Sequence, residues 1–289
     1  MVVTTGFFDG VHLGHRQVIE KLVSVAHERD TESVVVSFWP HPRTVLQDGA
    51  RSLRLLTTLD EKRHMLLEMG VDRVEVLNFT KEFSSMSASQ YLQDYVINEL
   101  GCDAIVLGYD NRIGSKASGS GDSLPDIAGS LGLEGIRTGA LDISGGPVSS
   151  TRIREALCRG DVSAASELLG YDYSIKGVVV SGNRIGHTIG FPTANMQLYE
   201  PLKAVPGNGV YMTEVSVQGR SLHGITNIGV RPTLGRDSSP VIETHILGFD
   251  EEIYGLDIRL SFVRKIRDEI KFKSLDLLRQ QLHKDMQVW

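Results

Sequence analysis

The chain has 289 residues, 41% hydrophobic and 23% charged, with a formal net charge of −6 at pH 7, which is ordinary composition for a globular protein of two domains. The acidic balance argues against nucleic acid as a general partner, and two cysteines are too few for a disulfide framework, so we expect a reducing compartment. No apolar run has membrane length and no signal pattern opens the chain, so we expect a cytoplasmic protein without a membrane partner or an evident obligate protein partner.

Residues 1 to about 170 alternate strand and helix patterns. The apolar run at residues 2–5 predicts a buried strand, and Val18, Leu22 and Val25 then recur at helical spacing. Further apolar runs at residues 34–38, 74–77 and 104–107 are typical of parallel strands buried on both faces. This alternation predicts a doubly wound, Rossmann-like sheet with helices on both faces, whose ligands bind beyond the carboxyl ends of the strands.

The motif GFFDGVHLGH, at residues 6–15, directly follows the first predicted strand. Its glycines permit tight turns, and the start of the next helix favours an anion. His12 and His15 lie three residues apart, so a first helical turn places both imidazoles on one side, where they can stabilise charge on phosphate oxygens. A capping His12 beside a solvated His15 is the simpler alternative, and a zinc site is another, although no cysteine is nearby. The combination favours attack at the α-phosphate of a nucleotide.

Hydroxyl groups and arginines gather in SSTRIR, at residues 149–154, where a helix is predicted to begin after Pro147. Helix starts bind anions and arginine grips phosphate with two hydrogen bonds, so Ser150 and Arg154 are candidate phosphate contacts. An ordinary helix cap with two solvated arginines is the alternative interpretation.

The pattern changes near Tyr171 to short strand-like runs separated by glycine-containing turns. These runs, at residues 175–180, 210–217, 223–228, 241–247 and 256–263, predict a small antiparallel β-barrel. A terminal helix capped by Ser274 follows. Its predicted apolar stripe consists of Leu275, Leu278, Leu282 and Met286. We place the boundary between Leu169 and Ser174, giving domains 1–170 and 171–289.

A second motif, GHTIGFPTAN at residues 186–195, lies in this half. The loop from Gly182 to Gly190 can wrap phosphates with its backbone N–H groups, although a plain hairpin connection is the default reading. Thr193 and Asn195 lie two apart on an extended segment and therefore on one face, which suits Mg²⁺ bridging phosphates. Glu243 lies between apolar residues of a predicted strand, where a carboxylate usually faces solvent.

The first motif resembles the His-x-Gly-His signature of the nucleotidyltransferase superfamily, and its longer string, residues 8–15, is similar to that of the bacterial bifunctional riboflavin kinase/FAD synthetases. Residues 190–195 resemble the riboflavin kinase signature of the same family. The two motifs occur in the family's order, and the resemblance covers essentially the whole chain. It implies ATP-dependent phosphorylation of riboflavin to FMN, then adenylylation of FMN by ATP to FAD and pyrophosphate, with Mg²⁺.

The resemblance also implies roles for individual residues. Glu243 would be the general base of the kinase, with His12 and His15 catalytic in the transferase. ATP or its phosphates would be bound by Gly6, Phe8, Asp9, Gly14, Ser150, Thr151, Arg154, Gly186 and Gly190. Flavin would contact Asp110 and Arg267, and the metal would contact Thr193 and Asn195.

Departures from the family pattern occur in the loop at residues 108–119, where Asn111 and Ile113 replace aromatic residues and Ala117 stands where a basic residue is common. His187 also replaces the usual arginine of the second motif. The altered loop leaves open a flavin-binding regulator whose transferase site has decayed. A nucleotidyltransferase of one activity, with the barrel as a binding module, is the other alternative, and the intact second motif counts against it.

Overall fold

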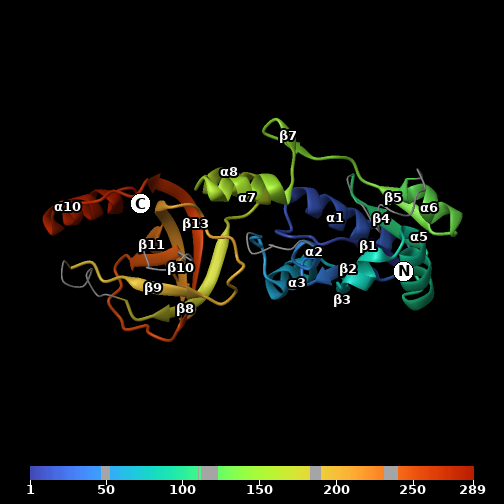
Figure 1. Ribbon diagram of the computed structural model, residues 1–289, viewed down its shortest axis with the longest axis horizontal. Helices are drawn as coiled ribbons and strands as arrows, with labels where there is room; N and C mark the ends of the chain where they lie inside the picture. Colours follow the sequence, from blue (N-terminus) through green and yellow to red (C-terminus); the bar gives the residue numbers. More distant parts are fainter. Residues whose placement is uncertain (47–52, 110, 112–122, 183–189, 231–239) are drawn as a thin grey trace. The chain divides into compact units, whose positions relative to one another are not determined.

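The computed structural model describes residues 1–289 except 47–52, 110, 112–122, 183–189 and 231–239 (Figure 1). The chain forms two compact units, Met1–Ser150 and Thr151–Trp289. Two helices before residue 170, α7 (Ser150–Cys158) and α8 (Val162–Leu169), thus lie almost wholly within the second unit. The domain boundary expected near residue 170 stays a prediction.

The first unit is built on a five-stranded parallel sheet with the order β3-β2-β1-β4-β5, as the alternating pattern predicted. Its strands are β1 (Val2–Thr5), β2 (Ser33–Trp39), β3 (Arg73–Asn78), β4 (Ala104–Leu107) and β5 (Glu134–Arg137). A small two-stranded sheet follows, formed by β6 (Asp142–Ile143) and β7 (Gly146–Pro147).

Helices cover both faces of this sheet, because successive strand residues point to opposite sides. Val2 packs in a core with α1 and α3, whereas Val3 packs in a second core with η2 and α6. The helices are α1 (Leu13–Glu28), α2 (Pro42–Leu46), α3 (Leu59–Glu68), α4 (Lys81–Ser85), α5 (Ala88–Gln90), the π-helix η2 (Tyr91–Glu99) and α6 (Leu124–Ser130). The doubly wound architecture is confirmed.

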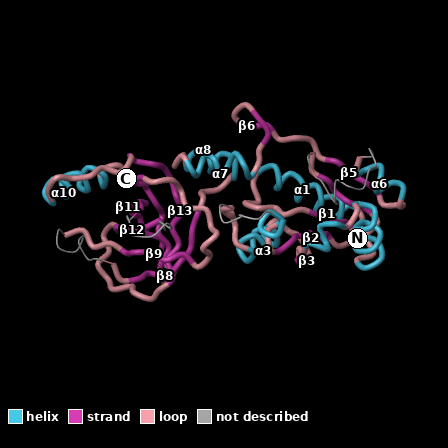
Figure 2. Tube along the Cα trace, viewed as in Figure 1, coloured by secondary structure: helices cyan, strands magenta, loops and turns pink. Residues whose placement is uncertain are grey.

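The second unit contains a closed antiparallel barrel with the strand order β10-β11-β12-β9-β8-β13 (Figure 2). Its strands are β8 (Ser174–Val180), β9 (Ala194–Leu198), β10 (Gly209–Val217), β11 (Arg220–Val230), β12 (Pro240–Ile246) and β13 (Asp257–Arg267). The terminal helix α10 (Leu275–Met286) begins after Ser274, whose side chain accepts a hydrogen bond from Leu277 N. The predicted barrel and terminal helix are confirmed.

Alternating burial along the strands decides which side chains fill the barrel. On β12, Ile242, Thr244 and Ile246 are buried, and the residues between them are only half-buried. Buried hydroxyls bond to one another inside: Thr226 Oγ1 lies 2.8 Å from Thr213 Oγ1 and 2.9 Å from Thr244 Oγ1. Most other buried strand residues of the barrel are apolar, and the polar side chains of alternate positions are left on the outer face.

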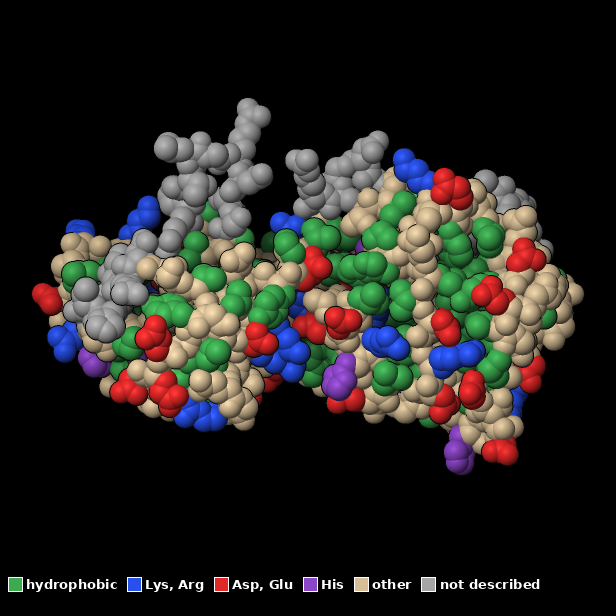
Figure 3. Space-filling model, turned by 90° about the horizontal axis from the view of Figure 1, so that it is seen from below, with side chains coloured by type: hydrophobic (Ala, Val, Ile, Leu, Met, Phe, Trp, Pro, Cys, Tyr) green, Lys and Arg blue, Asp and Glu red, His purple; other side chains and the backbone are tan. Residues whose placement is uncertain are grey.

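Charges of both signs are interspersed on the described surface of each unit visible in Figure 3. Within the described parts of the chain, no helix is both long and apolar enough to cross a membrane.

Candidate functional site

The first motif forms a turn between β1 and α1, and its two histidines lie together. His12 is the N-cap of α1, and its Nδ1 accepts a hydrogen bond from His15 N at 3.2 Å. The imidazole rings are stacked, with centroids 3.5 Å apart and planes inclined by 15°. The predicted placement of both rings on one side of the first helical turn is therefore confirmed, at the end of a helix that favours anions.

The backbone of this turn is strained. Phe8 has φ 52°, Gly10 has φ 85° and Val11 has φ 36°. Positive φ is uncommon for residues other than glycine and is unfavourable for a β-branched side chain such as Val11. Each such residue costs about 1–3 kcal/mol and persists only where its surroundings hold it, which is typical of functional sites.

Phe8 and the two glycines shape the space around the histidines. The Phe8 ring lies edge-on to His15 at a centroid distance of 5.2 Å, and a Cβ added at Gly6 would come within 3.1 Å of it. A Cβ at Gly14 would lie 3.4 Å from the His12 ring. These contacts give both glycines a steric role in the turn, and their roles in binding ATP stay predictions.

Asp9 is buried, and its carboxylate accepts hydrogen bonds from the loop before α3. Its donors are Leu56 N, at 3.0 and 3.1 Å to the two oxygens, and Thr57 N, at 3.0 Å. Ser150 Oγ donates to the Asp9 carbonyl at 2.9 Å. Asp9 thus stabilises the turn, and its predicted contact with ATP is not tested.

Lys62 of α3 is a further residue of this site, which the sequence analysis did not identify. Its side chain is buried, and Nζ donates to Phe7 O at 2.8 Å and to Ser37 Oγ at 2.7 Å. Burial lowers the pKa of Lys62 to about 8, although the nearby Asp9 carboxylate raises it. The one available signal was its spacing from the buried Leu66, four residues later on the same side of α3.

The remaining residues predicted for the transferase are placed less directly. Thr151 and Arg154 lie on α7, Thr151 exposed and Arg154 half-buried, within the second compact unit. Asp110 lies outside the described residues, as does Gly186 of the second motif. Their binding roles stay predictions.

The second motif leads into β9, where the barrel register brings together residues distant in sequence. Asn195 pairs with Glu243 on β12, and Glu243 pairs with Asn227 on β11. Directly opposed residues project from the same side of a sheet, and all three are half-buried, next to buried neighbours. The predicted general base and one predicted metal ligand therefore lie side by side on the outer face of the barrel.

A pocket of about 530 Å³ opens beside Asn195, and Glu243 and Asn227 are not among its described lining residues. Thr193 and Asn195 line it together with residues 249–254, the connection from β12 to β13. The described lining includes the carboxylates of Asp250, Glu251 and Glu252, and it includes no lysine or arginine. Glu251 is paired with Arg220 at 2.9 Å. The volume suits a small ligand, but among the described residues no group of three acidic, histidine or cysteine side chains is arranged to hold a metal ion.

Phe191 and Pro192, which begin the FPTAN string, are contacted by two histidines. His245 Nδ1 lies 2.8 Å from Pro192 O, and its ring lies 5.3 Å from the buried Phe191 ring. On the other side, His283 of α10 lies 5.0 Å from Phe191. The segment before Thr193 is thus held by both β12 and the terminal helix. Gly190, just before this segment, has φ 80°, and a Cβ added there would meet nothing within 4 Å. Backbone conformation rather than lack of space therefore favours glycine at this position.

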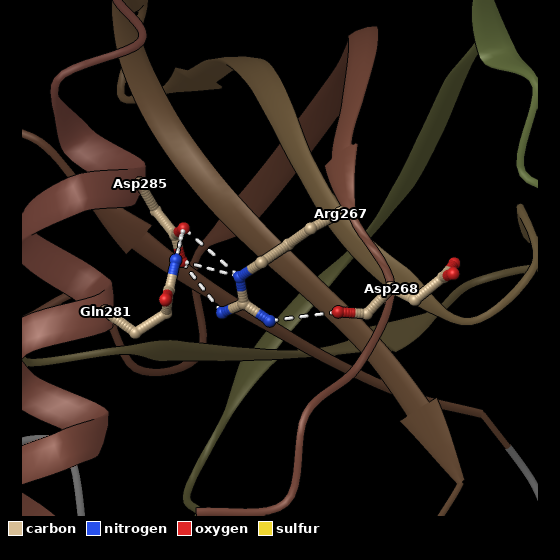
Figure 4. Close-up of polar contacts among 4 residues, drawn as sticks. All are labelled: Arg267, Asp268, Gln281 and Asp285. Atoms are coloured by element: carbon tan, nitrogen blue, oxygen red, sulfur yellow. Dashed lines mark hydrogen bonds and ion pairs between the residues drawn. The ribbon is translucent and has the colours of Figure 1, made fainter.

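Arg267, a predicted flavin contact, forms an ion pair with the terminal helix (Figure 4). Its Nε donates to both oxygens of Asp285 at 3.1 Å, and its Nη2 donates to one of them at 2.8 Å. Gln281 Nε2 donates to the same carboxylate at 2.8 Å, and Asp285 is only 2% exposed. These bonds fasten α10 to the end of β13, and contact with flavin stays a prediction.

Comparisons with known proteins match a different family model to each half of the chain. The family model for FAD synthetase matches residues 1–152, and the model for riboflavin kinase matches residues 169–289. Two proteins named bifunctional riboflavin kinase/FMN adenylyltransferase, from Listeria monocytogenes and Bacillus subtilis, are 36% and 37% identical over 289 residues, or 99% of this chain and 90% of theirs. The chain belongs to the bifunctional riboflavin kinase/FMN adenylyltransferase family.

A solved structure has the same fold over nearly the whole chain. It is titled a macrolide-efflux protein from Streptococcus pneumoniae, and it is 30% identical, with a TM-score of 0.92 over 99% of this chain and 92% of its own. Within this family framework, the histidine turn falls in the FAD synthetase match, and Thr193, Asn195 and Glu243 fall in the riboflavin kinase match.

Proposed function

We propose that this chain carries out both ATP-dependent steps of its family, phosphorylation of riboflavin to FMN and adenylylation of FMN to FAD. The observation that carries the proposal is the presence of two separate constellations, one in each compact unit. The stacked pair His12 and His15 stands at a helix start, and Glu243 stands beside Asn195 next to a pocket.

In the kinase step, Glu243 accepts the proton of the ribityl 5′-hydroxyl as that oxygen attacks the γ-phosphorus of ATP and the bond to the departing ADP breaks. Its place opposite Asn195, on the outer face of the barrel, supports this role. Thr193 and Asn195 would hold Mg²⁺, and they fit it, because Mg²⁺ takes a few oxygen ligands together with phosphate and water. When bound, the ion neutralises charge on the phosphates.

In the transferase step, an oxygen of the FMN phosphate attacks the α-phosphorus of ATP, and the bond to the departing pyrophosphate breaks. His12 and His15 donate hydrogen bonds to the oxygens on which charge builds, and the N–H groups at the start of α1 add to this stabilisation. Positioning and charge stabilisation account for most of the catalysis, without a covalent intermediate on the protein.

The other predicted contacts complete the proposal. Gly6, Phe8, Asp9 and Gly14 shape the nucleotide turn, with Ser150, Thr151 and Arg154 gripping the triphosphate. In the barrel unit, Gly186 and Gly190 belong to the phosphate loop of the kinase, and flavin contacts fall to Asp110 in the first site and Arg267 in the second. We also place the protein in the cytoplasm, since Cys102 and Cys158 are both free thiols.

The test is incubation of the protein with riboflavin, ATP and Mg²⁺, followed by chromatographic separation of riboflavin, FMN and FAD. We expect FMN to appear first and FAD to follow, and FMN supplied directly should also become FAD. FMN without FAD would indicate a decayed transferase, and FAD from FMN without use of riboflavin would indicate a nucleotidyltransferase of one activity.

A further inference from the structure

Lys62 occupies an unusual position for a lysine. It is 2% exposed, yet its Nζ bonds to two neutral acceptors, Phe7 O at 2.8 Å and Ser37 Oγ at 2.7 Å. Nζ also lies 4.0 Å from the centroid of the Phe7 ring. A buried ammonium is unfavourable unless its surroundings satisfy it well. The charge therefore serves to fasten α3 and the end of β2 to the carbonyl that precedes Phe8.

Lys62 provides one of several links between the segment 56–62 and the strained turn. The Asp9 carboxylate accepts hydrogen bonds from Leu56 N and Thr57 N, and Thr57 Oγ1 accepts one from Gly10 N at 3.1 Å. These hydrogen bonds hold Asp9 and Gly10, which follow Phe8, and Lys62 holds the carbonyl of Phe7, which precedes it. The positive φ of Phe8 is thus enclosed between fixed residues on both sides.

We propose that Lys62 is a positioning residue for adenylyl transfer, whose ammonium holds the Phe7 carbonyl so that Phe8 and the stacked histidines stay in register with the nucleotide. This rests on the transferase function proposed above. Phe8 transmits the effect, because its ring packs edge-on against His15. A displacement of about 1 Å at a reacting centre lowers a rate by about 100-fold, so a loosened turn affects turnover strongly.

The ammonium form is the effective one, because a charged donor makes hydrogen bonds roughly twice as strong as a neutral one. Burial lowers the pKa of Lys62 to about 8. The Asp9 carboxylate of the turn raises this pKa. Two other titratable groups lie near: His41, whose ring centroid is 4.0 Å from that of Phe7, and Glu61 of α3, which is engaged in the capping box at Thr58. FAD synthesis should therefore decline as the pH rises past about 8.

The experiment measures FAD formation from FMN and ATP by the full chain between pH 6.5 and 9, with FMN formation from riboflavin as the internal control. Lys62→Met should lower kcat for FAD roughly 10- to 100-fold, change KM for ATP little, and lack the decline above pH 8. Ser37→Ala removes one acceptor of the ammonium, so the decline should begin at lower pH. Lys21→Met, which changes an exposed lysine on α1, should alter neither activity.

Wild-type FAD synthesis is measured first, and its absence would refute the proposed transferase rather than the role of Lys62. If the wild type is active, a normal kcat in Lys62→Met, or an unchanged alkaline decline in that variant, overturns the positioning role. Circular dichroism and urea denaturation report on folding, and the kinase activity shows whether any loss is confined to adenylyl transfer. Should Lys62→Met fail to fold, Ser37→Ala decides, since an unmoved decline there also overturns the proposal.

Discussion

The two candidate sites of this protein are held in place by different means. The transferase site is a single turn whose strained residues are held by buried polar groups, Asp9 and Lys62, from its own unit. The kinase site contains a row of side chains on the outer face of the barrel, formed by Asn195 and the opposing Glu243. The register of two antiparallel strands places this barrel row. Turn geometry therefore depends on a few buried hydrogen bonds, whereas the barrel row depends on a backbone ladder shared by many residues.

The two sites should therefore respond differently to the loss of a side chain. Removing a supporting side chain should disturb the transferase turn, because its positive φ values persist only where surrounding groups hold them. The barrel row should tolerate loss of a functional side chain without rearranging, since backbone hydrogen bonds fix its strands. The following substitutions test that expectation in order of decreasing effect.

Replacing Glu243 by glutamine tests the kinase side of the comparison. The amide keeps the size of the side chain but cannot accept the hydroxyl proton, so FMN formation should fall by a factor on the order of 10² to 10⁴. Conversion of supplied FMN to FAD should be unchanged. A single-turnover FMN assay, with riboflavin binding measured in parallel, checks this. Near-normal turnover would remove Glu243 from the mechanism, and lost binding would make it a flavin contact instead.

Replacing His12 or His15 by alanine tests the transferase side. Loss of a donor to the developing charge should cost roughly 3 kcal/mol in the transition state, or about 10² in kcat for FAD. FMN formation should stay nearly unchanged. His64→Ala, at an exposed histidine of α3, is the matched control and should leave both activities intact. Equal loss of both activities in His12→Ala would point to a folding role.

How far the sequence could predict the molecule depends on the kind of interaction. Buried parallel strands appear in the sequence as apolar runs, and the doubly wound sheet could be predicted from their alternation with helical patterns. The barrel followed from glycine-bounded runs, although β9 was not predicted as a strand, because it is short and begins within the second motif. The histidine pair was predictable because a helical turn relates residues three apart.

Contacts between segments distant in sequence were not predictable. Lys62 lies among Asp60, Glu61 and Arg63, which resembles a solvated run of charges, and only the fold places it against Phe7. The predicted apolar stripe of α10 agrees with the structure in part, because Leu278, Leu282 and Met286 are half-buried. Leu275 is 54% exposed, and the residue that the helix buries is Asp285, held by Arg267. A buried carboxylate cannot be inferred when its partner lies elsewhere in the chain.

The extent of the kinase unit can be sharpened with two fragments, 151–289 and 171–289. In the structure, α8 packs on β13, and Gly207 N donates to Leu157 O of α7 at 2.8 Å. Burial of an aliphatic side chain contributes about 1.5–3 kcal/mol, so loss of both helices should lower the free energy of unfolding by at least about 3 kcal/mol. Urea denaturation measures this. Both fragments should make FMN and no FAD if the barrel alone holds the kinase site, and equal stability would show that the helices belong to the other domain.

The bond between α10 and the barrel is tested by Asp285→Asn. The substitution removes the charge that Arg267 grips, and hydrogen bonds to charged groups contribute about 1.5–3 kcal/mol, so stability should fall by about 2 kcal/mol. Glu251→Gln, which breaks the exposed pair with Arg220, is the control and should cost less than about 1 kcal/mol. Because His283 of α10 contacts Phe191, KM for the kinase substrates should also rise in Asp285→Asn. An unchanged denaturation midpoint would show that the ion pair does not hold the helix.

The smallest expected effect is the change with pH in the contribution of Lys62 to the free energy of unfolding. Burial lowers its pKa to about 8 in the folded protein, from 10.5 when unperturbed. Between these values the unfolded chain binds more protons than the folded one, so the contribution of Lys62 to the free energy of unfolding increases with pH. Relative to Lys62→Met, the wild type should gain about 1 kcal/mol between pH 7.5 and 9, since the limit is about 1.4 kcal/mol per pH unit. Denaturation of both proteins at each pH measures the difference and cancels the titration of other groups. The contribution of Lys62 to stability should thus rise over the range in which FAD synthesis declines, so loss of that contribution cannot explain the decline. A constant difference between the two proteins would show that Lys62 does not titrate in this range.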